Sequence, residues 1–211
     1  MAEPFHEPLT VWRFIRRYFV RIVIGAVLVV AVYGALLVMV EYQTYQREQR
    51  IATEIQAYGG YVQFVYAGPD WIPQSMRDRT ALFSRVMVIS LTNTAGLEHL
   101  KELTDLGILS LDGIQVTDSD LEHLKGLTNL YDLRLDATQV TDAGLEHLKG
   151  LTNLYVLTLG GMQVTDNGLV HLKGLTNLVL LEIGGTQVTP EGRAMLRKAL
   201  PNCVIRWIRI Q

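Results

Sequence analysis

Four histidines recur at equal intervals and could, by residue type, form a row of metal ligands. They are His99, His123, His147 and His171, each 24 positions after the previous one. Each lies between two leucines of a short predicted helix, as in the stretch from Leu145 to Leu148. Adjacent helices pack about 8–10 Å apart, whereas zinc needs ligand nitrogens at about 2.0–2.1 Å. We therefore predict that the histidines are structural and that they bind no metal.

Three aspartates, Asp118, Asp142 and Asp166, recur in the same way, and carboxylates are calcium ligands. Each follows a threonine at the start of a predicted short helix, where helix capping explains it without a metal. The chain has no G-x-x-x-x-G-K-S/T motif, no G-x-G-x-x-G motif after a strand and no serine in a nucleophile elbow. A catalytic residue is expected to occur once in the chain, whereas most polar residues here recur at the same position of several repeats. We expect no catalytic residue, no cofactor and no enzyme activity.

These residues belong to a segment that repeats every 24 residues, with copies starting at Leu103, Leu127, Leu151 and Leu175. The second copy reads LTNLYDLRLDATQVTDAGLEHLKG. Its L-x-x-L-x-L part predicts a half-buried strand, and Thr141 is the predicted N-cap of the short helix that follows. One such unit cannot bury its leucines alone. The repeats must therefore stack on one another, which predicts a solenoid.

The repeated L-x-x-L-x-L and T-D-x-G-L-x-x-L patterns resemble the leucine-rich repeat family over residues 79–211. Within that family they are similar to bacterial membrane-anchored repeat proteins. They also resemble substrate receptors of ubiquitin ligases, which carry a cysteine where this chain has Ile114, Thr138, Met162 and Thr186. No F-box-like segment is recognised before the repeats, so the ubiquitin-ligase role is a remote alternative. The resemblance implies an α/β solenoid with parallel strands on the concave side and short helices on the convex side.

Composition is ordinary for a globular chain of 211 residues. Hydrophobic residues make up 49%, charged residues make up 19%, and the net charge is −2. This balance gives no electrostatic argument for binding nucleic acid. Cys203 is the only cysteine, so an intramolecular disulfide cannot form.

The N-terminal region predicts a membrane anchor. Residues 1–21 form a basic tail, and residues 22–40 are uncharged and long enough to cross a bilayer as a transmembrane helix. The end of this stretch lacks the small residues of a cleavage site, which favours an uncleaved signal anchor over a cleaved signal or a buried soluble helix. Four arginines precede it and two follow closely, so we expect a cytoplasmic N-terminus and repeats on the outer, periplasmic-type side. Ala31 and Ala35 could support a weak homo-oligomer.

The remaining segments are expected to close the two ends of the solenoid. Residues 41–78 read as a juxtamembrane helix and strand that cap its first repeat, with a flexible linker as the alternative. Residues 79–102 are a degenerate repeat that lacks Q-V-T-D. The repeat domain comprises residues 79–211, and its C-terminal cap ends in a predicted strand from Val204 to Ile210. The sequence does not decide which side of this strand faces inward.

Residues at the outward strand positions vary between copies while the framework repeats. This is what a protein-binding scaffold needs, although solvated strands would look the same. The candidate concave face consists of Ile108, Ser110, Asp112, Asp132, Arg134, Asp136, Val156, Thr158, Leu180 and Glu182. Arg134, with aspartates around it, is the best single candidate contact; an internal Arg–Asp pair is the alternative. Two functions remain. The first is a non-catalytic module that binds an unknown protein or peptide and is anchored in the lipid bilayer by residues 22–40. The alternative is a structural envelope protein without a specific ligand.

Overall fold

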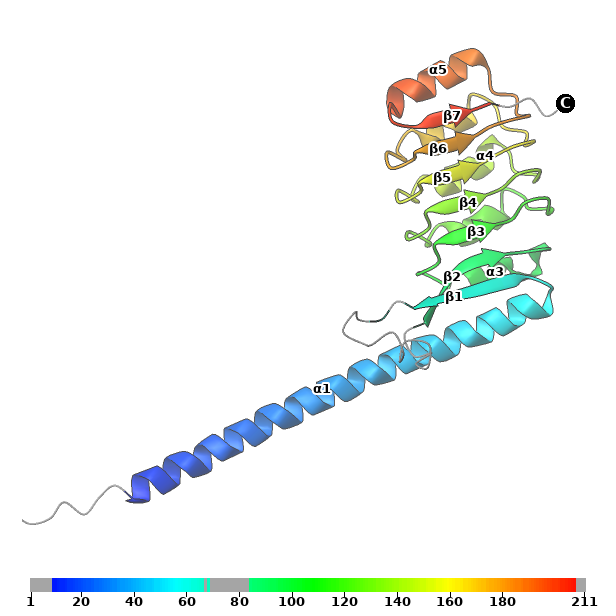
Figure 1. The fold of residues 1–211 in the computed structure, drawn as a ribbon. Helices are drawn as coiled ribbons and strands as arrows, with labels where there is room; N and C mark the ends of the chain where they lie inside the picture. Colours follow the sequence, from blue (N-terminus) through cyan, green and yellow to red (C-terminus); the bar gives the residue numbers. More distant parts are fainter. Residues whose placement is uncertain (1–8, 67, 69–83, 208–211) are drawn as a thin grey trace, which may run out of the picture. The chain divides into compact units, whose positions relative to one another are not determined.

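A computed structural model describes residues 9–66, 68 and 84–207 (Figure 1). The chain divides into two compact units, one up to Thr44 and the other from Tyr45 to Gln211. The helix α1, Leu9–Ala57, occupies the first unit and continues into the second. All strands and short helices belong to the second unit.

The α1 helix covers the predicted transmembrane segment and the predicted juxtamembrane helix without a break. Neither segment contains proline, and its two glycines, Gly25 and Gly34, cost far less than proline in a helix interior. Part of the predicted tail, from Leu9 onward, is also helical. The portion Val23–Ala57 contains a window of mean hydropathy 2.8 with no buried residue, which makes it long and apolar enough to cross a membrane.

The end of α1 is set by glycine. Gly59 has a φ of +81°, a left-handed conformation in which a Cβ would be strained. The Gly60 N–H then donates to the Ile55 carbonyl oxygen at 3.0 Å, which closes the last turn. In this last part of the helix, within the second unit, Ile51 and Ile55 are fully buried. The Glu48 carboxylate accepts the Val86 N–H at 2.9 Å. These contacts join the end of α1 to the first strands of the solenoid.

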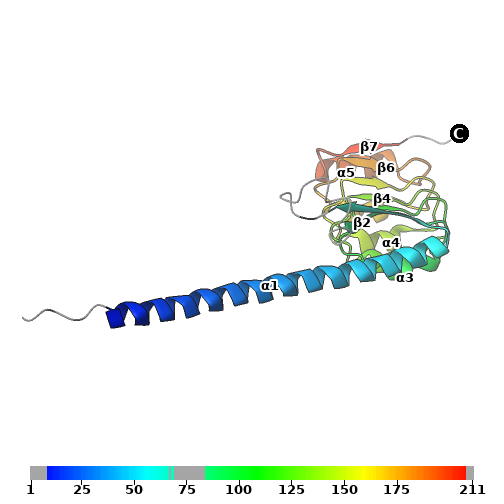
Figure 2. The same ribbon diagram turned by 60° about the horizontal axis from the view of Figure 1, so that its bottom comes forward.

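Seven strands form one sheet in sequence order (Figures 1 and 2). They are β1 (Tyr61–Tyr66), β2 (Ser84–Ser90), β3 (Ile108–Ser110), β4 (Asp132–Arg134), β5 (Val156–Thr158), β6 (Leu180–Glu182) and β7 (Val204–Arg206). The β1–β2 pair is antiparallel, and all later neighbours are parallel. The register places Leu109, Leu133, Leu157, Leu181 and Ile205 opposite one another. This row of buried side chains is the centre of the core, as expected for stacked repeats.

Short helical turns close each repeat on the other side of the core. They are η2 (Thr94–Gly96), α3 (Leu97–Leu100), η3 (Asp120–Leu124), α4 (Asp142–Leu145), η4 (Glu146–Leu148), η5 (Gly168–Leu172) and α5 (Pro190–Ala199). The N-cap predicted at Thr141 is confirmed, because its hydroxyl accepts the Ala143 N–H at 3.4 Å. Thr189 caps α5 in the same way, with Pro190 at the first helical position. The longer α5 covers the last repeat.

The three recurring aspartates act between repeats, which helix capping alone does not explain, although Asp142 does lie in the first turn of α4 as expected. Asp118 accepts the Thr141 N–H and hydroxyl of the next repeat, and Asp142 and Asp166 bind Thr165 and Thr189 alike. The receiving threonine lies 23 positions later, where the stack brings it alongside the aspartate. We call this row the Asp–Thr ladder. It satisfies one main-chain and one side-chain donor at each junction.

The start of the ladder explains one irregular residue. The repeat before Thr117 has no aspartate at the ladder position, because this degenerate repeat lacks Q-V-T-D. Thr117 instead donates its N–H and hydroxyl to Asp120 of its own repeat, both at 2.8 Å. Later copies carry glycine at the Asp120 position, and a Cβ there would overlap the carboxylate of the preceding ladder aspartate. The departure of Asp120 from the repeat pattern therefore follows from the missing ladder partner.

Only parts of the two predicted end regions can be compared with the structure. In the N-terminal segment 41–78, β1 pairs with β2, while residues 67 and 69–78 lie outside the described residues. At the C-terminus β7 ends at Arg206, and residues 208–210 of the predicted strand also lie outside. Ile205 is buried whereas Val204 and Arg206 are exposed, so the inward face of this strand is now assigned.

Candidate functional site

The predicted binding residues lie on one face of β3–β6, but they are not all exposed. Asp112 and Arg134 are exposed. The half-buried members are Ile108, Ser110, Asp136, Val156, Leu180 and Glu182. Asp132 and Thr158 are buried, at 8% and 7% exposure, which corrects their assignment as outward contact positions. Thr158 is covered because its register neighbours on β4 and β6 are the longer Arg134 and Glu182.

Arg134 and Asp132 form a two-point ion pair on β4. The Arg134 Nη2 lies 3.2 Å from Asp132 Oδ2, and the Nε lies 3.3 Å from Oδ1. The hydrogen bonds and the charge of Asp132 raise the pKa of the Arg134 guanidinium. The side chain of Arg134 remains 51% exposed, so one side of the guanidinium is open to a partner. The intramolecular pair and an exposed cation are therefore both present.

Two carboxylates continue this charged row at the carboxyl ends of the strands. Asp112 Oδ1 accepts the Asp136 N–H at 3.0 Å, and Asp136 accepts the Gly160 N–H of the next repeat. Burial raises the pKa of the Asp136 carboxyl; the Gly160 hydrogen bond opposes this rise, and the negative charge of Asp112 adds to it. Asp136 is thus a poorly solvated carboxyl held in place by two neighbouring repeats.

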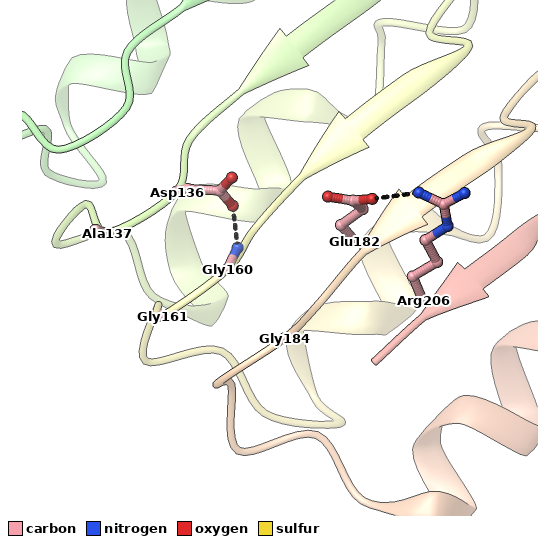
Figure 3. Close-up of a pocket in the computed structure, with 7 residues that line it drawn as sticks. All are labelled: Asp136, Ala137, Gly160, Gly161, Glu182, Gly184 and Arg206. Atoms are coloured by element: carbon pink, nitrogen blue, oxygen red, sulfur yellow. Dashed lines mark hydrogen bonds and ion pairs between the residues drawn. The ribbon is translucent and has the colours of Figure 1, made fainter. Parts of the chain in front are cut away.

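A recess of about 290 Å³ opens beside Asp136 (Figure 3). Its lining residues are Asp136, Ala137, Gly160, Gly161, Glu182, Gly184 and Arg206. A Cβ on Gly160 would lie 2.7 Å from Asp136 Oδ1, so glycine is needed there and leaves the space empty. Across the recess the Arg206 Nη1 lies 3.1 Å from Glu182 Oε1. The recess therefore presents two carboxyl groups and one guanidinium on a floor without side chains.

Sequence reasoning found Asp136 and Glu182 but missed the glycines and Arg206. The Gly-Gly pairs at 160–161 and 184–185, which replace Asp-Gly and Asp-Ala of earlier copies, were an available signal. Arg206 could not be assigned because the inward face of β7 was undecided. The recurring histidines are not brought together with metal ligands: no group of three His, Cys, Asp or Glu in the described part of the chain could hold a metal ion.

No protein-family model matches the chain, and no curated protein matches it. Among solved structures, the chain is similar to internalin C2 from Listeria monocytogenes strain 4b F2365, with 28% identity and a TM-score of 0.46 over 53% of this chain and 46% of that one. It is also similar to an internalin (inlF) of the same strain, with 20% identity and a TM-score of 0.38 over 51% of this chain and 36% of that one. The chain thus covers less than half of either internalin.

Proposed function

We propose that the chain is a membrane-tethered leucine-rich repeat module that mediates protein–protein interaction without catalysis. The surface we assign to the partner is the strand face, defined as the outward residues of β3–β6 with the recess beside Asp136. The single observation that carries this proposal is the contrast between a framework that repeats in contact detail and a strand face that changes at every repeat. Scaffolds that bind other proteins combine these two properties.

Framework contacts repeat closely along the stack. Asn129, Asn153 and Asn177 donate from Nδ2 to the carbonyl oxygens of Thr104, Thr128 and Thr152, at 3.0, 2.8 and 2.9 Å. The Asp–Thr ladder repeats on the helix side with similar regularity. On the strand face, by contrast, one row reads Ser110, Arg134, Thr158 and Glu182. The framework contacts are the same around all four residues, so the framework does not dictate which residue occupies this row.

The charges of the strand face indicate the kind of partner surface. Four carboxylates lie along it, Asp112, Asp136, Glu182 and the buried Asp132, together with two guanidinium groups, Arg134 and Arg206; Asp132 contributes its charge through its pair with Arg134 and not as a contact residue. The sum of four negative and two positive charges is −2, so a complementary partner offers more basic than acidic groups. Because Arg134 keeps an exposed side within this acidic surround, one acidic partner residue fits at the centre.

The membrane tether is supported by α1. The side chains of Val29 and Val30 are 69% and 71% exposed, and the helix contains the apolar window described above. A water-exposed stripe of this length is unfavourable, whereas a bilayer of about 30 Å solvates it. The arginines before residue 22 support a cytoplasmic N-terminus and repeats on the outer side.

Orientation is tested with a reporter that is active only outside the cytoplasm. Fused after Gln211 it should be active, and fused before Trp12 it should be inactive. The reverse pattern would refute the orientation while keeping the anchor. Activity at neither position, with the chain in the soluble fraction, would refute the anchor as well.

The interaction is tested by placing a photo-crosslinking residue at one exposed position at a time in native membranes. Arg134 on the strand face and Glu146 on the helix side are matched, with side chains 51% and 56% exposed. We expect a discrete adduct with another protein from position 134, absent from position 146, and competed away by an excess of the chain without crosslinker. Equal adducts from both positions would contradict the strand-face assignment. Adducts only with a second copy of the chain would instead support the structural envelope role.

A further inference from the structure

A second recess lies at the opposite ends of the strands, beside the residues where β5 and β6 begin. Its volume is about 670 Å³, and it is a shallow, open groove. The residues that matter here are Tyr131, Asn153, Tyr155, Thr176, Asn177 and Asn202. We call this the tyrosine–amide groove. Parallel strands place all their amino ends on one edge, so the groove and the recess beside Asp136 are separate sites.

The two tyrosines of the groove are exposed, and the ring of Tyr131 is also packed against the preceding repeat. Tyr131 and Tyr155 stand directly before β4 and β5 and are 40% and 53% exposed. A Cβ on Gly107 would lie 2.5 Å from Tyr131 Cε1, so the ring of Tyr131 rests on the bare backbone of the preceding repeat. The next residue in this row is Val179, which lacks a ring. The groove opens at that point, where the row of tyrosines ends.

Amide side chains provide neutral hydrogen-bonding groups around the rings. Asn153 and Asn177 each use Nδ2 to bind a carbonyl oxygen of the preceding repeat, which orients their Oδ1 atoms as available acceptors. The Asn202 side chain is exposed and has no partner among the residues that the structure describes. Neither tyrosine hydroxyl has a hydrogen-bond partner there either. The groove therefore offers aromatic surface with unused donors and acceptors.

The groove carries no residue that is charged at neutral pH. An ionic ligand would leave water without gaining a counter-charge, which is unfavourable. A sugar matches the groove better, because a pyranose ring has an apolar C–H face that stacks on an aromatic ring and hydroxyls that pair with amides. We propose that the tyrosine–amide groove binds a neutral oligosaccharide. This inference does not depend on the proposed protein partner.

An extended peptide fits less well, since peptides commonly bind to sheets by adding a strand to an open edge. The backbone at this groove belongs to the interior of the sheet and is already paired. Tyr155 N donates to Tyr131 O, Val179 N to Tyr155 O and Val204 N to Val179 O, at 2.8, 2.9 and 2.7 Å. A ligand therefore cannot bind here by adding a strand, which leaves the side chains as its main contacts, as for stacked sugars.

The test is isothermal titration calorimetry on the full chain in a detergent without a sugar headgroup. The neutral probes are chitotetraose and cellotetraose; the charged probes are the glucosamine tetramer and tetragalacturonate. We expect at least one neutral probe to bind with a dissociation constant of about 1 mM or lower and both charged probes to bind more weakly. Tyr155→Ala should weaken binding roughly tenfold or more, while Tyr155→Phe, which keeps the ring, should retain most of it.

The matched control is Tyr61→Ala on β1, because Tyr61 is 59% exposed and lies at the other end of the sheet. It should leave binding unchanged, and thermal unfolding should verify that each variant is folded. No heat from either neutral probe at about 10 mM would overturn the proposal. So would equal effects of the Tyr155 and Tyr61 changes, or tighter binding of the charged probes. Binding of an uncharged tetrapeptide, with no binding of either sugar, would assign the groove to peptides instead.

Discussion

The carboxylate of Asp118 accepts two hydrogen bonds from Thr141 of the next repeat, one from the main-chain N–H and one from the hydroxyl, both at 2.7 Å. The same pairing recurs between Asp142 and Thr165 and between Asp166 and Thr189. Repeats are thus joined on the helix side by carboxylates and in the core by leucines. The first contribution is directional, and the second depends on buried area.

Removing one carboxylate of the Asp–Thr ladder should destabilise the solenoid. Asp118→Ala leaves the Thr141 N–H without its acceptor, and we expect a loss of about 1–3 kcal/mol in the free energy of unfolding. Urea unfolding of the detergent-solubilised chain, followed by circular dichroism, measures this loss. As a control, Glu122→Ala should change stability by less than about 0.5 kcal/mol, because Glu122 is exposed and its ion pair with Lys125 lies at the surface. Equal losses in both variants would contradict the ladder.

The substitution Gly192→Ala should change the stability of the chain in opposite directions, depending on whether Asp166 is present. A Cβ on Gly192 would overlap the Asp166 carboxylate, to which its three nearest atoms all belong, so Gly192→Ala should be destabilising in the natural chain. With Asp166→Ala in place the overlap is gone, and alanine in the helix α5 should then stabilise by up to about 1 kcal/mol over glycine.

A double-mutant cycle measures this coupling between Gly192 and Asp166. The reversal of sign separates the steric explanation from an intrinsic need for glycine. If Gly192→Ala destabilised equally in both backgrounds, the steric explanation would be wrong.

Replacing Ala137 with glycine should stabilise the folded chain. It is the one non-glycine residue with positive φ in the described part of the chain, at 57°, while Gly113, Gly161 and Gly185 occupy the equivalent turns. A left-handed conformation costs an L-residue about 1–2 kcal/mol, and the extra unfolded-state freedom of glycine offsets part of the gain. Ala137→Gly should therefore raise stability by about 0.5–1 kcal/mol.

The control for this turn is Ala143→Gly in α4, where φ is negative and glycine should lower stability. Differential scanning calorimetry of both variants compares the two signs directly. A lower melting temperature for Ala137→Gly would show that the turn is not strained.

The Asp136 carboxyl should lower the stability of the folded chain as pH rises from its unfolded pKa to its higher folded pKa. Burial raises the pKa of its carboxyl in the folded chain, whereas the unfolded carboxyl titrates near about 3.9. Its stabilising contribution is complete below the unfolded pKa. It is lost as pH rises toward the folded pKa, because the unfolded state ionises first. Asp136→Asn keeps an acceptor for the Gly160 N–H and should remove this loss.

Urea unfolding from about pH 3 to pH 7 gives the difference between the natural chain and Asp136→Asn. Glu146→Gln provides a control of opposite sign, since Lys149 lowers the pKa of Glu146 and its contribution is lost as pH falls. A difference curve for Asp136→Asn that does not change with pH would contradict the shifted pKa.

Leu133 and His147 should differ sharply in their effect on stability. Leu133 is fully buried and lies in the leucine row between two repeats, so Leu133→Ala should cost about 2–5 kcal/mol. His147 Nδ1 is buried and has no hydrogen-bond partner among the described residues, so His147→Ala should cost less than about 1 kcal/mol. A melting temperature lowered by a chelator would contradict the structural role of the histidines.

Much of the architecture could be predicted because each repeat carries its own local instructions. Leu130, Leu133 and Leu135 specify which strand side is buried, and Thr141 specifies where the helix begins. The candidate site was only partly predictable. Asp132 and Thr158 belong to the outward row by alternation, yet both are buried. Thr158 lies between the longer Arg134 and Glu182 of the neighbouring strands, and Asp132 pairs with the guanidinium of Arg134. Exposure depends on the neighbours across strands, which a period cannot specify.

The sequence by itself determined the 24-residue period, the buried leucine row, the Thr141 cap and the apolar stretch within α1, because each depends on residues close together in the chain. The tertiary structure decided which distant residues meet. Asp118 reaches Thr141, 23 positions later, only because stacking places it there; in sequence it is indistinguishable from a local cap. The recess beside Asp136 exists where glycine replaces a larger residue, and the tyrosine–amide groove exists where valine follows two tyrosines in the same row. Such a space belongs to the packed repeats and to no single one of them.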